Sequence, residues 1–458
     1  MSAGRTRKLF GTDGIRGTAN VHPMTPEVAL ALGRAIAHVF REREGHRKQI
    51  LIGKDTRLSG YMFEDAMAAG ICSMGVNVIQ VGPVPTPALA FLTHDMRCNA
   101  GVMITASHNP YQDNGLKFFA ADGFKLPDAE EARIEELIET GEVSKISVLP
   151  DEIGQASRIE DARGRYVVYL KHTFPRDLTL DGMRIVIDCA NGAGYRTGPT
   201  VLRELGAEVF EIGCEPNGRN INEECGSLYP ERAAAKVKEL RADVGIALDG
   251  DADRVIVIDE RGEVFDGDML MWLCARDMKA RGTLANDTVV ATVMSNLGLE
   301  LALDSIGVRL LRTQVGDRYV VEAMREAGHN LGGEQSGHIL FLDESTTGDG
   351  MMSALRILAL MARSGQRLSE LNEGFERLPQ VLVNIGVAEK RPLEELPSLQ
   401  EAIADVEDEL GDAGRVLIRY SGTELKARVM VEGRDESRVH EIANHLASKL
   451  KRALAEVG

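Results

Sequence analysis

Three segments of the chain repeat one pattern of strand, helix and strand, and this repeat restricts the possible folds more than any other feature. Each copy begins with an apolar run that predicts a buried strand, at residues 49–53, 184–188 and 288–292. After a helix-length segment, a second strand opens with glycine and a small apolar residue, at Gly75-Val76, Gly206-Ala207 and Gly307-Val308. Near-continuous apolar strands joined through helices are typical of parallel βαβ units. The repeat therefore predicts three similar mixed α/β domains.

The last part of the chain follows a different pattern. Strands are expected at 379–388, 415–419 and 427–431. Apolar residues at helical spacing then predict a C-terminal helix (Val439, Ile442, Ala443, Leu446 and Leu450). A chain of 458 residues should form about three or four domains. We predict an α/β protein with three similar domains, residues 1–160, 161–262 and 263–375, followed by a smaller α+β domain, residues 376–458.

Charge and cysteine content narrow the setting in which the protein works. The chain has 53 Lys and Arg against 70 Asp and Glu, a net charge of −17, which argues against nucleic acid or an anionic membrane surface as the main partner. One uncharged stretch, residues 66–93, contains three prolines and reads as helix, strand and loop rather than a membrane span. The six cysteines form no C-x-x-C pair, and no apolar signal core follows the N-terminus. We expect a soluble protein of a reducing compartment.

The third element of each repeat leads into an unusual polar loop. These loops are residues 105–110, 249–254 and 332–338. Ligand sites in parallel α/β sheets form at the carboxyl ends of the strands. Three such loops, one from each domain, could therefore meet at one cleft.

The second loop places Asp249, Asp251 and Asp253 directly after an apolar strand. Three carboxylates this close repel one another unless a cation lies among them, and hard oxygen ligands suit Mg²⁺ or Ca²⁺. An EF-hand is disfavoured because Arg254 stands where that loop needs glycine. A phosphatase of the haloacid-dehalogenase type, with Asp249 as its nucleophile, also places Asp-x-Asp after a strand and stays open, as does a solvated acidic turn.

The first loop contains Ser107, followed by His108, Asn109 and Pro110. The chain has no G-x-S-x-G elbow, so a hydrolase triad is poorly supported. Taken alone, a serine in a polar loop is more often part of a turn than a nucleophile. Opposite a carboxylate-bound Mg²⁺, however, a phosphorylated Ser107 could complete the metal's coordination with its phosphate oxygens.

A fourth polar segment lies in the C-terminal domain. Arg419-Tyr420-Ser421-Gly422-Thr423 offers a guanidinium, two short hydroxyls and a glycine turn, with Arg428 on the next strand. This combination fits a phosphate monoester. An ordinary hairpin with Ser-Gly at its turn is the alternative.

Taken together, the loops resemble those of the α-D-phosphohexomutases. The resemblance rests on the four loops in that family's order, on Phe10 to Gly17 near the N-terminus, and on Asp113 to Phe118 after the serine loop. The form Gly332-Gly333-Glu334-Gln335-Ser336-Gly337-His338 resembles the branch that acts on glucosamine phosphate. One departure is Leu425, where many members have proline, which bears on the rigidity of the phosphate loop.

The resemblance implies a role for each motif in a heart-shaped, four-domain molecule with a central cleft. Ser107 would be the phosphoserine, and its phosphoryl group would share Mg²⁺ with Asp249, Asp251 and Asp253. Lys117 and His338 would be the general acid and base, with Arg16 and Arg254 offsetting phosphoryl charge. Sugar hydroxyls would be held by Glu334 and Ser336. The phosphate that is not transferred would be bound by Arg419, Ser421, Gly422, Thr423 and Arg428.

The activity implied by the resemblance is the interconversion of glucosamine 6-phosphate and glucosamine 1-phosphate through a bound 1,6-bisphosphate. A phosphomannomutase or phosphoglucomutase is the alternative within the same family, and a non-catalytic Ca²⁺-binding module is a remote one. The bisphosphate intermediate must rotate within the cleft without being released, so we expect a mobile C-terminal domain. The resemblance also implies a bacterial, cytoplasmic role in supplying UDP-N-acetylglucosamine, with a small phosphosugar as the only predicted partner.

Overall fold

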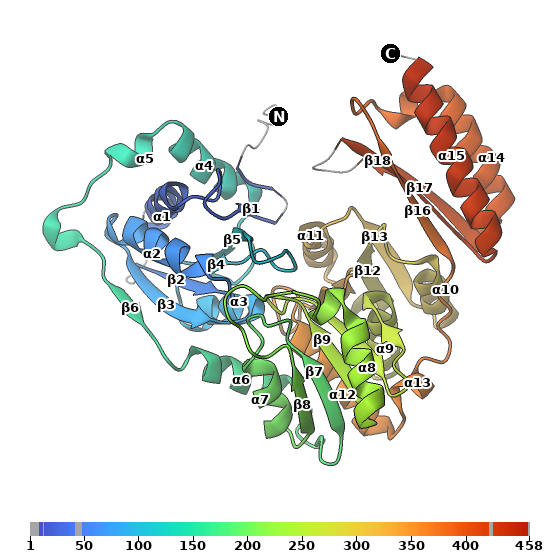
Figure 1. The fold of residues 1–458 in the computed structure, drawn as a ribbon, viewed down its shortest axis with the longest axis horizontal. Helices are drawn as coiled ribbons and strands as arrows, with labels where there is room; N and C mark the ends of the chain where they lie inside the picture. The colour runs from blue at the N-terminus through green and yellow to red at the C-terminus, as the bar shows by residue number, and fades with distance from the viewer. Residues whose placement is uncertain (1–8, 12, 42–47, 421–424, 457–458) are drawn as a thin grey trace. The chain divides into compact units, whose positions relative to one another are not determined.

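The computed structural model describes residues 9–11, 13–41, 48–420 and 425–456. The chain divides into two compact units, residues 1–292 with 313–373 and residues 293–312 with 374–458. The first unit contains the sheets of the first two repeats and strands β12, β14 and β15 of the third, and the second unit contains an antiparallel sheet (Figure 1). The predicted fold class, three α/β domains followed by a different C-terminal domain, is confirmed.

The first domain is built on a mixed sheet of six strands in the order β1-β5-β4-β2-β3-β6. β2 is parallel to β3 and β4, whereas β5 is antiparallel to both β4 and β1. Buried residues of α1 and α2 pack on one face, and α3 contacts β2 and β4 from the other. The elements are β1 (Ile15–Thr18), α1 (Pro26–Arg41), β2 (Gln49–Lys54), α2 (Ser59–Cys72), β3 (Asn77–Pro83), α3 (Thr86–Asp95), β4 (Ala100–Ile104), β5 (Asp113–Ala120), α4 (Asp128–Glu139), α5 (Glu142–Lys145) and β6 (Ala156–Arg158).

The second domain has a five-stranded sheet in the order β11-β10-β9-β7-β8. β7 is parallel to β8 and β9, and β10 returns antiparallel to β9 around the three aspartates. Every residue of β9 and β10 is buried, so the aspartate loop that joins them is flanked on both sides by buried strands. The elements are α6 (Ala162–Thr173), β7 (Arg184–Asp188), α7 (Thr197–Glu204), β8 (Glu208–Ile212), α8 (Pro230–Leu240), β9 (Val244–Leu248), β10 (Val255–Asp259) and β11 (Val264–Phe265).

The third repeat completes the first unit. β14 pairs in parallel with β12 and antiparallel with β15, which repeats the return-strand arrangement of the other two domains. Its elements in this unit are α9 (Gly267–Ala280), β12 (Thr288–Thr292), α11 (Asp317–Ala327), β14 (Leu331–Gly333), β15 (Ile339–Phe341), α12 (Gly350–Ser364) and α13 (Leu368–Leu371). Asp349 caps α12 by accepting a hydrogen bond from the N–H of Met352.

The second unit has a three-stranded antiparallel sheet in the order β16-β18-β17. Side chains of α14 and α15 bury one face of this sheet in a single apolar cluster. The elements are α10 (Leu297–Ser305), β16 (Gln380–Gly386), α14 (Pro397–Leu410), β17 (Gly414–Tyr420), β18 (Lys426–Gly433) and α15 (Glu436–Glu456), and β13 (Arg309–Thr313) reaches the border between the units.

The predicted repeat agrees closely with the strands. β7 and β12 have the predicted bounds, and β2 is one residue longer. Gly75, Gly206 and Gly307 all have positive φ, between 70° and 104°, a backbone region that glycine enters at little cost. These glycines end the helix and turn the chain into the second strand of each repeat. Residues 66–93 form parts of α2 and α3 with β3 between them, and among the described residues no helix combines the length and the apolar character needed to cross a membrane.

Candidate active site

Three hairpin loops of the first unit carry most of the predicted site residues. They join β4 to β5, β9 to β10 and β14 to β15. In each repeat the strand that enters the loop is parallel to the strand that begins the repeat, so each loop leaves the carboxyl edge of its parallel strands. Gly332 and Gly333, predicted to lie in the third loop, are instead the last residues of β14.

Ser107 is held in a constrained conformation. Its φ is 51°, in the left-handed region, and only 1% of its surface is exposed. Its Oγ donates a hydrogen bond of 2.6 Å to Oδ2 of Asp249. Nδ1 of His108 lies 3.4 Å from the same Oγ, but burial and the charge of Arg254 lower the pKa of His108 to about 4. The serine hydroxyl therefore faces the aspartate loop, beside an imidazole that is neutral at pH 7.

The three aspartates form a buried cluster. One carboxylate oxygen of each aspartate lies within 4.8 Å of those of the other two, and all three residues are buried. Burial and the charges of Asp253 and Asp251 raise the pKa of Asp249 well above its usual range. Oδ1 of Asp251 and Oδ1 of Asp253 are buried and accept no hydrogen bond from the described residues, although Nδ1 of His338 lies 3.6 Å from the second of these oxygens. A cation held by these oxygens would relieve both the repulsion and the missing contacts, so the residues present fit a metal ion.

Lys117 supplies positive charge to this cluster from β5. Its Nζ lies 2.7 Å from Oδ2 of Asp251 and 3.0 Å from Oδ2 of Asp253, and its side chain is 3% exposed. Burial lowers the pKa of Lys117, but the two aspartates outweigh burial and the net pKa is raised. Lys117 is therefore charged and fixed beside the carboxylates.

Two predicted arginines lie near the serine and the aspartates. The backbone N–H of Arg254 donates to Oδ1 of Asp249 at 3.2 Å, and its Nη1 lies 3.2 Å from Nδ1 of His108. Arg16, on β1, donates to Oδ2 of Asp13 at 2.9 Å. Nε of each arginine is buried and donates to no described partner. Both guanidiniums can therefore still bind an incoming anion.

The third loop brings His338 to the same cluster. Its Nδ1 lies 3.6 Å from Oδ1 of Asp253, and its Nε2 lies 3.5 Å from Oδ2 of Asp317. Burial lowers the pKa of His338, but Asp253 and Asp317 outweigh burial and raise it. Nε2 can accept the N–H of Gly348, at 3.2 Å, only when the ring is neutral. His338 is thus placed to hold a proton or release it.

Glu334 and Ser336 lie beside this histidine in the hairpin. The N–H of Gly316 donates to Oε1 of Glu334 at 3.2 Å, and burial raises the pKa of Glu334. Ser336 is exposed at the hairpin tip. Both are open to a ligand in a way that the aspartates are not.

The remaining predicted residues belong to the second unit. Arg419 on β17 and Arg428 on β18 are direct cross-strand neighbours. Burial and the charge of Arg428 lower the pKa of Arg419, and Nε of Arg419 is buried with no hydrogen-bond acceptor among the described residues. Ser421, Gly422 and Thr423, predicted to bind phosphate with these arginines, lie outside the described residues. Two adjacent guanidiniums on one sheet make a natural anion site.

Sequence reasoning missed two residues that contact the cluster. Thr86, the first residue of α3, donates from Oγ1 to Oδ2 of Asp251 at 2.6 Å. Asp317 contacts His338 and also Lys125, with Lys125 Nζ 2.6 Å from Asp317 Oδ2. Neither residue belongs to a local motif, and their partners lie far away in sequence, so no spacing rule could have found them.

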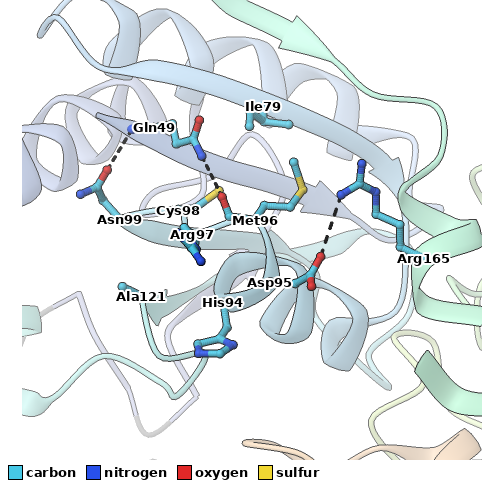
Figure 2. Close-up of a pocket in the computed structure, with 10 residues that line it drawn as sticks. All are labelled: Gln49, Ile79, His94, Asp95, Met96, Arg97, Cys98, Asn99, Ala121 and Arg165. Carbon is cyan, nitrogen blue, oxygen red and sulfur yellow. Dashed lines mark hydrogen bonds and ion pairs between the residues drawn. The ribbon is translucent and has the colours of Figure 1, made fainter. Parts of the chain in front are cut away.

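A separate pocket of about 940 Å³ lies at the opposite edge of the first sheet (Figure 2). It is lined by residues next to the starts of β2 and β4, including Gln49 and Asn99. Two of its residues, Asp95 and Arg165, are half-exposed and form an ion pair, with Nη1 of Arg165 3.9 Å from Oδ2 of Asp95. None of the predicted site residues that the structure describes lines it. The pocket is therefore distinct from the serine and aspartate cluster.

Comparison with known families decides the relationship. Four family models match in order along the chain: phosphoglucomutase/phosphomannomutase domain I at residues 7–145, domain II at 165–262, domain III at 266–378 and the C-terminal domain at 382–449. The chain belongs to the phosphoglucomutase/phosphomannomutase family. The resemblance to α-D-phosphohexomutases that the motifs indicate is thereby confirmed.

Individual members of the family are similar along almost their whole length. A phosphoglucosamine mutase of Syntrophotalea carbinolica is 57% identical over 448 residues, which cover 98% of both chains. A phosphoglucomutase/phosphomannomutase family protein of Burkholderia thailandensis has the same fold, with a TM-score of 0.81 at 24% identity over 96% of this chain and 97% of the other. An N-acetylphosphoglucosamine mutase of Aspergillus fumigatus, solved with GlcNAc-6P and magnesium, has a TM-score of 0.65 at 19% identity over 97% and 96%.

Proposed function

We propose that the protein is a phosphoglucosamine mutase, an isomerase that interconverts glucosamine 6-phosphate and α-D-glucosamine 1-phosphate. The observation that carries this proposal is the hydrogen bond of 2.6 Å from Ser107 Oγ to a buried triad of aspartates. It occurs in a chain 57% identical to a phosphoglucosamine mutase over 98% of both chains. A hydroxyl that carries a phosphoryl group needs a strong local source of positive charge, and a metal held by these aspartates would supply it.

Mg²⁺ is the proposed cofactor. Asp249, Asp251 and Asp253 would hold it, and a phosphoryl oxygen on Ser107 would complete its coordination. Three carboxylates with two buried, unbonded oxygens are the hard donor set that Mg²⁺ prefers. When bound, the ion would neutralise charge on the phosphoryl group during transfer.

The proposed cycle uses this chain's own groups in two symmetrical transfers. The bond between phosphorus and Ser107 Oγ breaks while phosphorus bonds to O1 of glucosamine 6-phosphate; a general base takes the proton of O1, and a general acid protonates Ser107 Oγ. The resulting 1,6-bisphosphate reorients in the site. Ser107 Oγ then loses its proton and bonds to the 6-phosphoryl group, while O6 takes up a proton as its bond to phosphorus breaks. Lys117 and His338 are the proposed general acid and base, since Nζ of Lys117 and the imidazole of His338 both lie beside the aspartates.

Other groups would orient the substrate. Arg16 and Arg254 would offset phosphoryl charge with guanidiniums whose Nε atoms are buried. Glu334 and Ser336 would bind sugar hydroxyls from the third hairpin. In the second unit, Arg419 and Arg428, with Ser421, Gly422 and Thr423, would grip the phosphate that is not being transferred.

We also propose the setting and the domain limits. All six cysteines are free thiols, which supports a reducing cytoplasmic location. The four family-model matches support domain limits near residues 160, 262 and 375, although the third match extends to residue 378.

A mutase assay with glucosamine, glucose and mannose 6-phosphates side by side, with Mg²⁺ and matching bisphosphate primers, tests the substrate. We expect strong preference for the glucosamine ester. Equal or faster turnover of the other esters would instead favour a phosphoglucomutase or phosphomannomutase, and it would remove the argument from the form of the loop Gly332 to His338.

The variant Ser107→Ala tests the chemistry in the same assay. We expect mutase activity to fall to background while the protein stays folded, because the phosphoryl carrier is gone. Release of inorganic phosphate that survives Ser107→Ala and is lost in Asp249→Asn would identify an aspartate-dependent phosphatase and overturn the proposal.

A further inference from the structure

Arg57 is a fully buried arginine that the proposed reaction does not use. It follows β2 within the segment Lys54-Asp55-Thr56-Arg57, and both Asp55 and Arg57 are completely inaccessible to solvent. Nε of Arg57 donates to Oδ2 of Asp55 at 2.8 Å, and its backbone N–H donates to Oδ1 of the same residue at 2.9 Å. Asp55 therefore fixes the plane of the guanidinium, which is costly to bury unless it has several acceptors.

The acceptors of this guanidinium are backbone carbonyls of the serine loop. Nη2 donates to the carbonyl of Ser107 at 3.0 Å and to that of Asn109 at 2.8 Å. Nη1 donates to the carbonyls of Asp113, at 3.0 Å, and of Pro110. One rigid guanidinium thus binds four backbone carbonyls between Ser107 and Asp113.

Asp55, the ion-pair partner of Arg57, fixes the backbone N–H of Ser107 through Thr105. Oγ1 of Thr105 donates to Oδ2 of Asp55 at 2.7 Å, and the N–H of Ser107 donates to Oγ1 of Thr105 at 2.9 Å. Both backbone polar groups of Ser107 are therefore fixed by the Asp55–Arg57 pair. This stabilises the left-handed φ of 51° that a serine rarely adopts.

A second donor reaches the same carbonyls from the second domain. Nδ2 of Asn222 donates to the carbonyl of Ser107 at 2.8 Å and to that of Asn109 at 2.9 Å. Gly250, in the loop that carries the three aspartates, packs so closely that a Cβ added there would lie 2.5 Å from the carbonyl oxygen of Ser107. The serine loop is thus tied to the domain that carries the aspartates at the residue whose Oγ would react.

We propose that Arg57 and Asn222 are positioning residues that aim Ser107 Oγ at the aspartate cluster by clamping the carbonyls of Ser107 and Asn109. The inference rests on the proposed role of Ser107 as phosphoryl carrier. With the backbone of Ser107 fixed at both its N–H and its carbonyl, Oγ lies where it donates to Asp249. Loosening either donor lets the loop and its phosphoryl group drift, and displacements of about 1 Å at a reacting centre can cost about 100-fold in rate.

The variant Asn222→Gly tests the clamp with little risk to folding, because glycine accepts the φ of 58° at this position. Its matched control is Asn191→Gly, which removes an equally buried asparagine with φ of 49° from the same domain. The amide of Asn191 donates to Asn220 and Cys225 rather than to the serine loop. Arg57→Lys is the second test variant, since lysine keeps a charge beside Asp55 but cannot reach four carbonyls.

The readout is single-turnover transfer of labelled phosphate from the phosphoenzyme to glucosamine 6-phosphate, with KM measured separately. We expect the transfer rate to fall by roughly 10- to 100-fold in Asn222→Gly and Arg57→Lys. KM should change little, the ³¹P signal of the phosphoserine should broaden or shift, and Asn191→Gly should behave as wild type.

Two outcomes would overturn the inference. One is a wild-type transfer rate in Asn222→Gly, and the other is an equal loss of rate in Asn191→Gly. Either leaves the proposed function standing as long as Ser107→Ala abolishes transfer. Full activity in Ser107→Ala would instead remove the proposed function itself.

Discussion

The serine and aspartate cluster of the first unit and the arginine pair of the second unit manage charge in opposite ways. In the first, the carboxylates already have Lys117 as an internal counter-charge at 2.7 and 3.0 Å, and Ser107 is hydrogen-bonded in place. In the second, Arg419 and Arg428 are neighbours of like charge, and their proximity together with burial lowers the pKa of Arg419.

The difference indicates a division of labour. Groups that would carry out phosphoryl transfer are assembled before any ligand arrives, which is how preorganised electrostatic stabilisation works. Groups that would grip the spectator phosphate are two guanidiniums placed side by side on neighbouring strands, whose like charges a phosphate would neutralise.

Removal of divalent metal should lower mutase activity more than any other change. A smaller effect would contradict the contrast drawn between the serine and aspartate cluster and the arginine pair. Dialysis against EDTA should abolish mutase activity, and Mg²⁺ should restore it, because the buried carboxylates cannot share a phosphoryl group without a cation. Activity is measured before and after adding back Mg²⁺. Full activity in metal-free enzyme would mean that Lys117 alone balances the cluster.

Arg419→Gln should have the next largest effect. Loss of one charged hydrogen bond is worth about 1.5–3 kcal/mol, so kcat/KM should fall by roughly 10- to 100-fold, mainly through KM. The control is Arg434→Gln, which removes an arginine that is 63% exposed in the same unit. An unchanged KM in Arg419→Gln would show that the arginine pair does not bind substrate phosphate.

Asp249→Asn should stabilise the metal-free protein while it destroys activity. The pKa of Asp249 is raised by burial and by Asp253 and Asp251, so its ionised form at pH 7 opposes folding. Each unit of such a shift is worth about 1.4 kcal/mol. Denaturant unfolding in EDTA measures the gain, with Asp243→Asn as control, because Asp243 is an exposed residue directly before β9 whose bond from the N–H of Arg184 an asparagine oxygen can still accept. A loss of stability in Asp249→Asn would show that the cluster is not strained without metal.

Asp349→Asn should give the smallest effect, and it tests whether a carboxylate outside the aspartate triad is strained, mainly by burial and to a smaller extent by the charge of Asp253. Burial raises the pKa of Asp349 to about 6, although it accepts bonds from Met352 and Tyr166. A raised pKa stabilises the fold at low pH, and this contribution is lost as pH rises from about 4 to 6. The unfolding free energy should therefore depend less on pH in this window in Asp349→Asn. An unchanged slope would contradict the assignment.

The sequence predicted the parts of the fold that local pattern determines. Apolar runs located β7 and β12 to the residue, and glycines at positive φ marked the start of each second strand. Motif resemblance then predicted which loops carry chemistry. The three aspartates were predictable because the strands on both sides of their loop are fully buried.

The rest could not be predicted because it depends on contacts between distant segments. Thr86 lies 165 positions before Asp251, and Asn222 lies 115 positions after Ser107. Neither spacing has a periodicity to detect. Arg57 belongs to none of the motifs that the sequence analysis singled out, whereas the structure buries it completely against the serine loop.

Mass spectrometry of the peptide that contains Ser107 tests the central claim most directly. The enzyme is first phosphorylated with glucosamine 1,6-bisphosphate and then mixed rapidly with glucosamine 6-phosphate. Phosphate should be found on Ser107 at the start and should leave it at least as fast as kcat. Phosphate on Asp249, or a Ser107 phosphate that stays in place through many turnovers, would contradict the account.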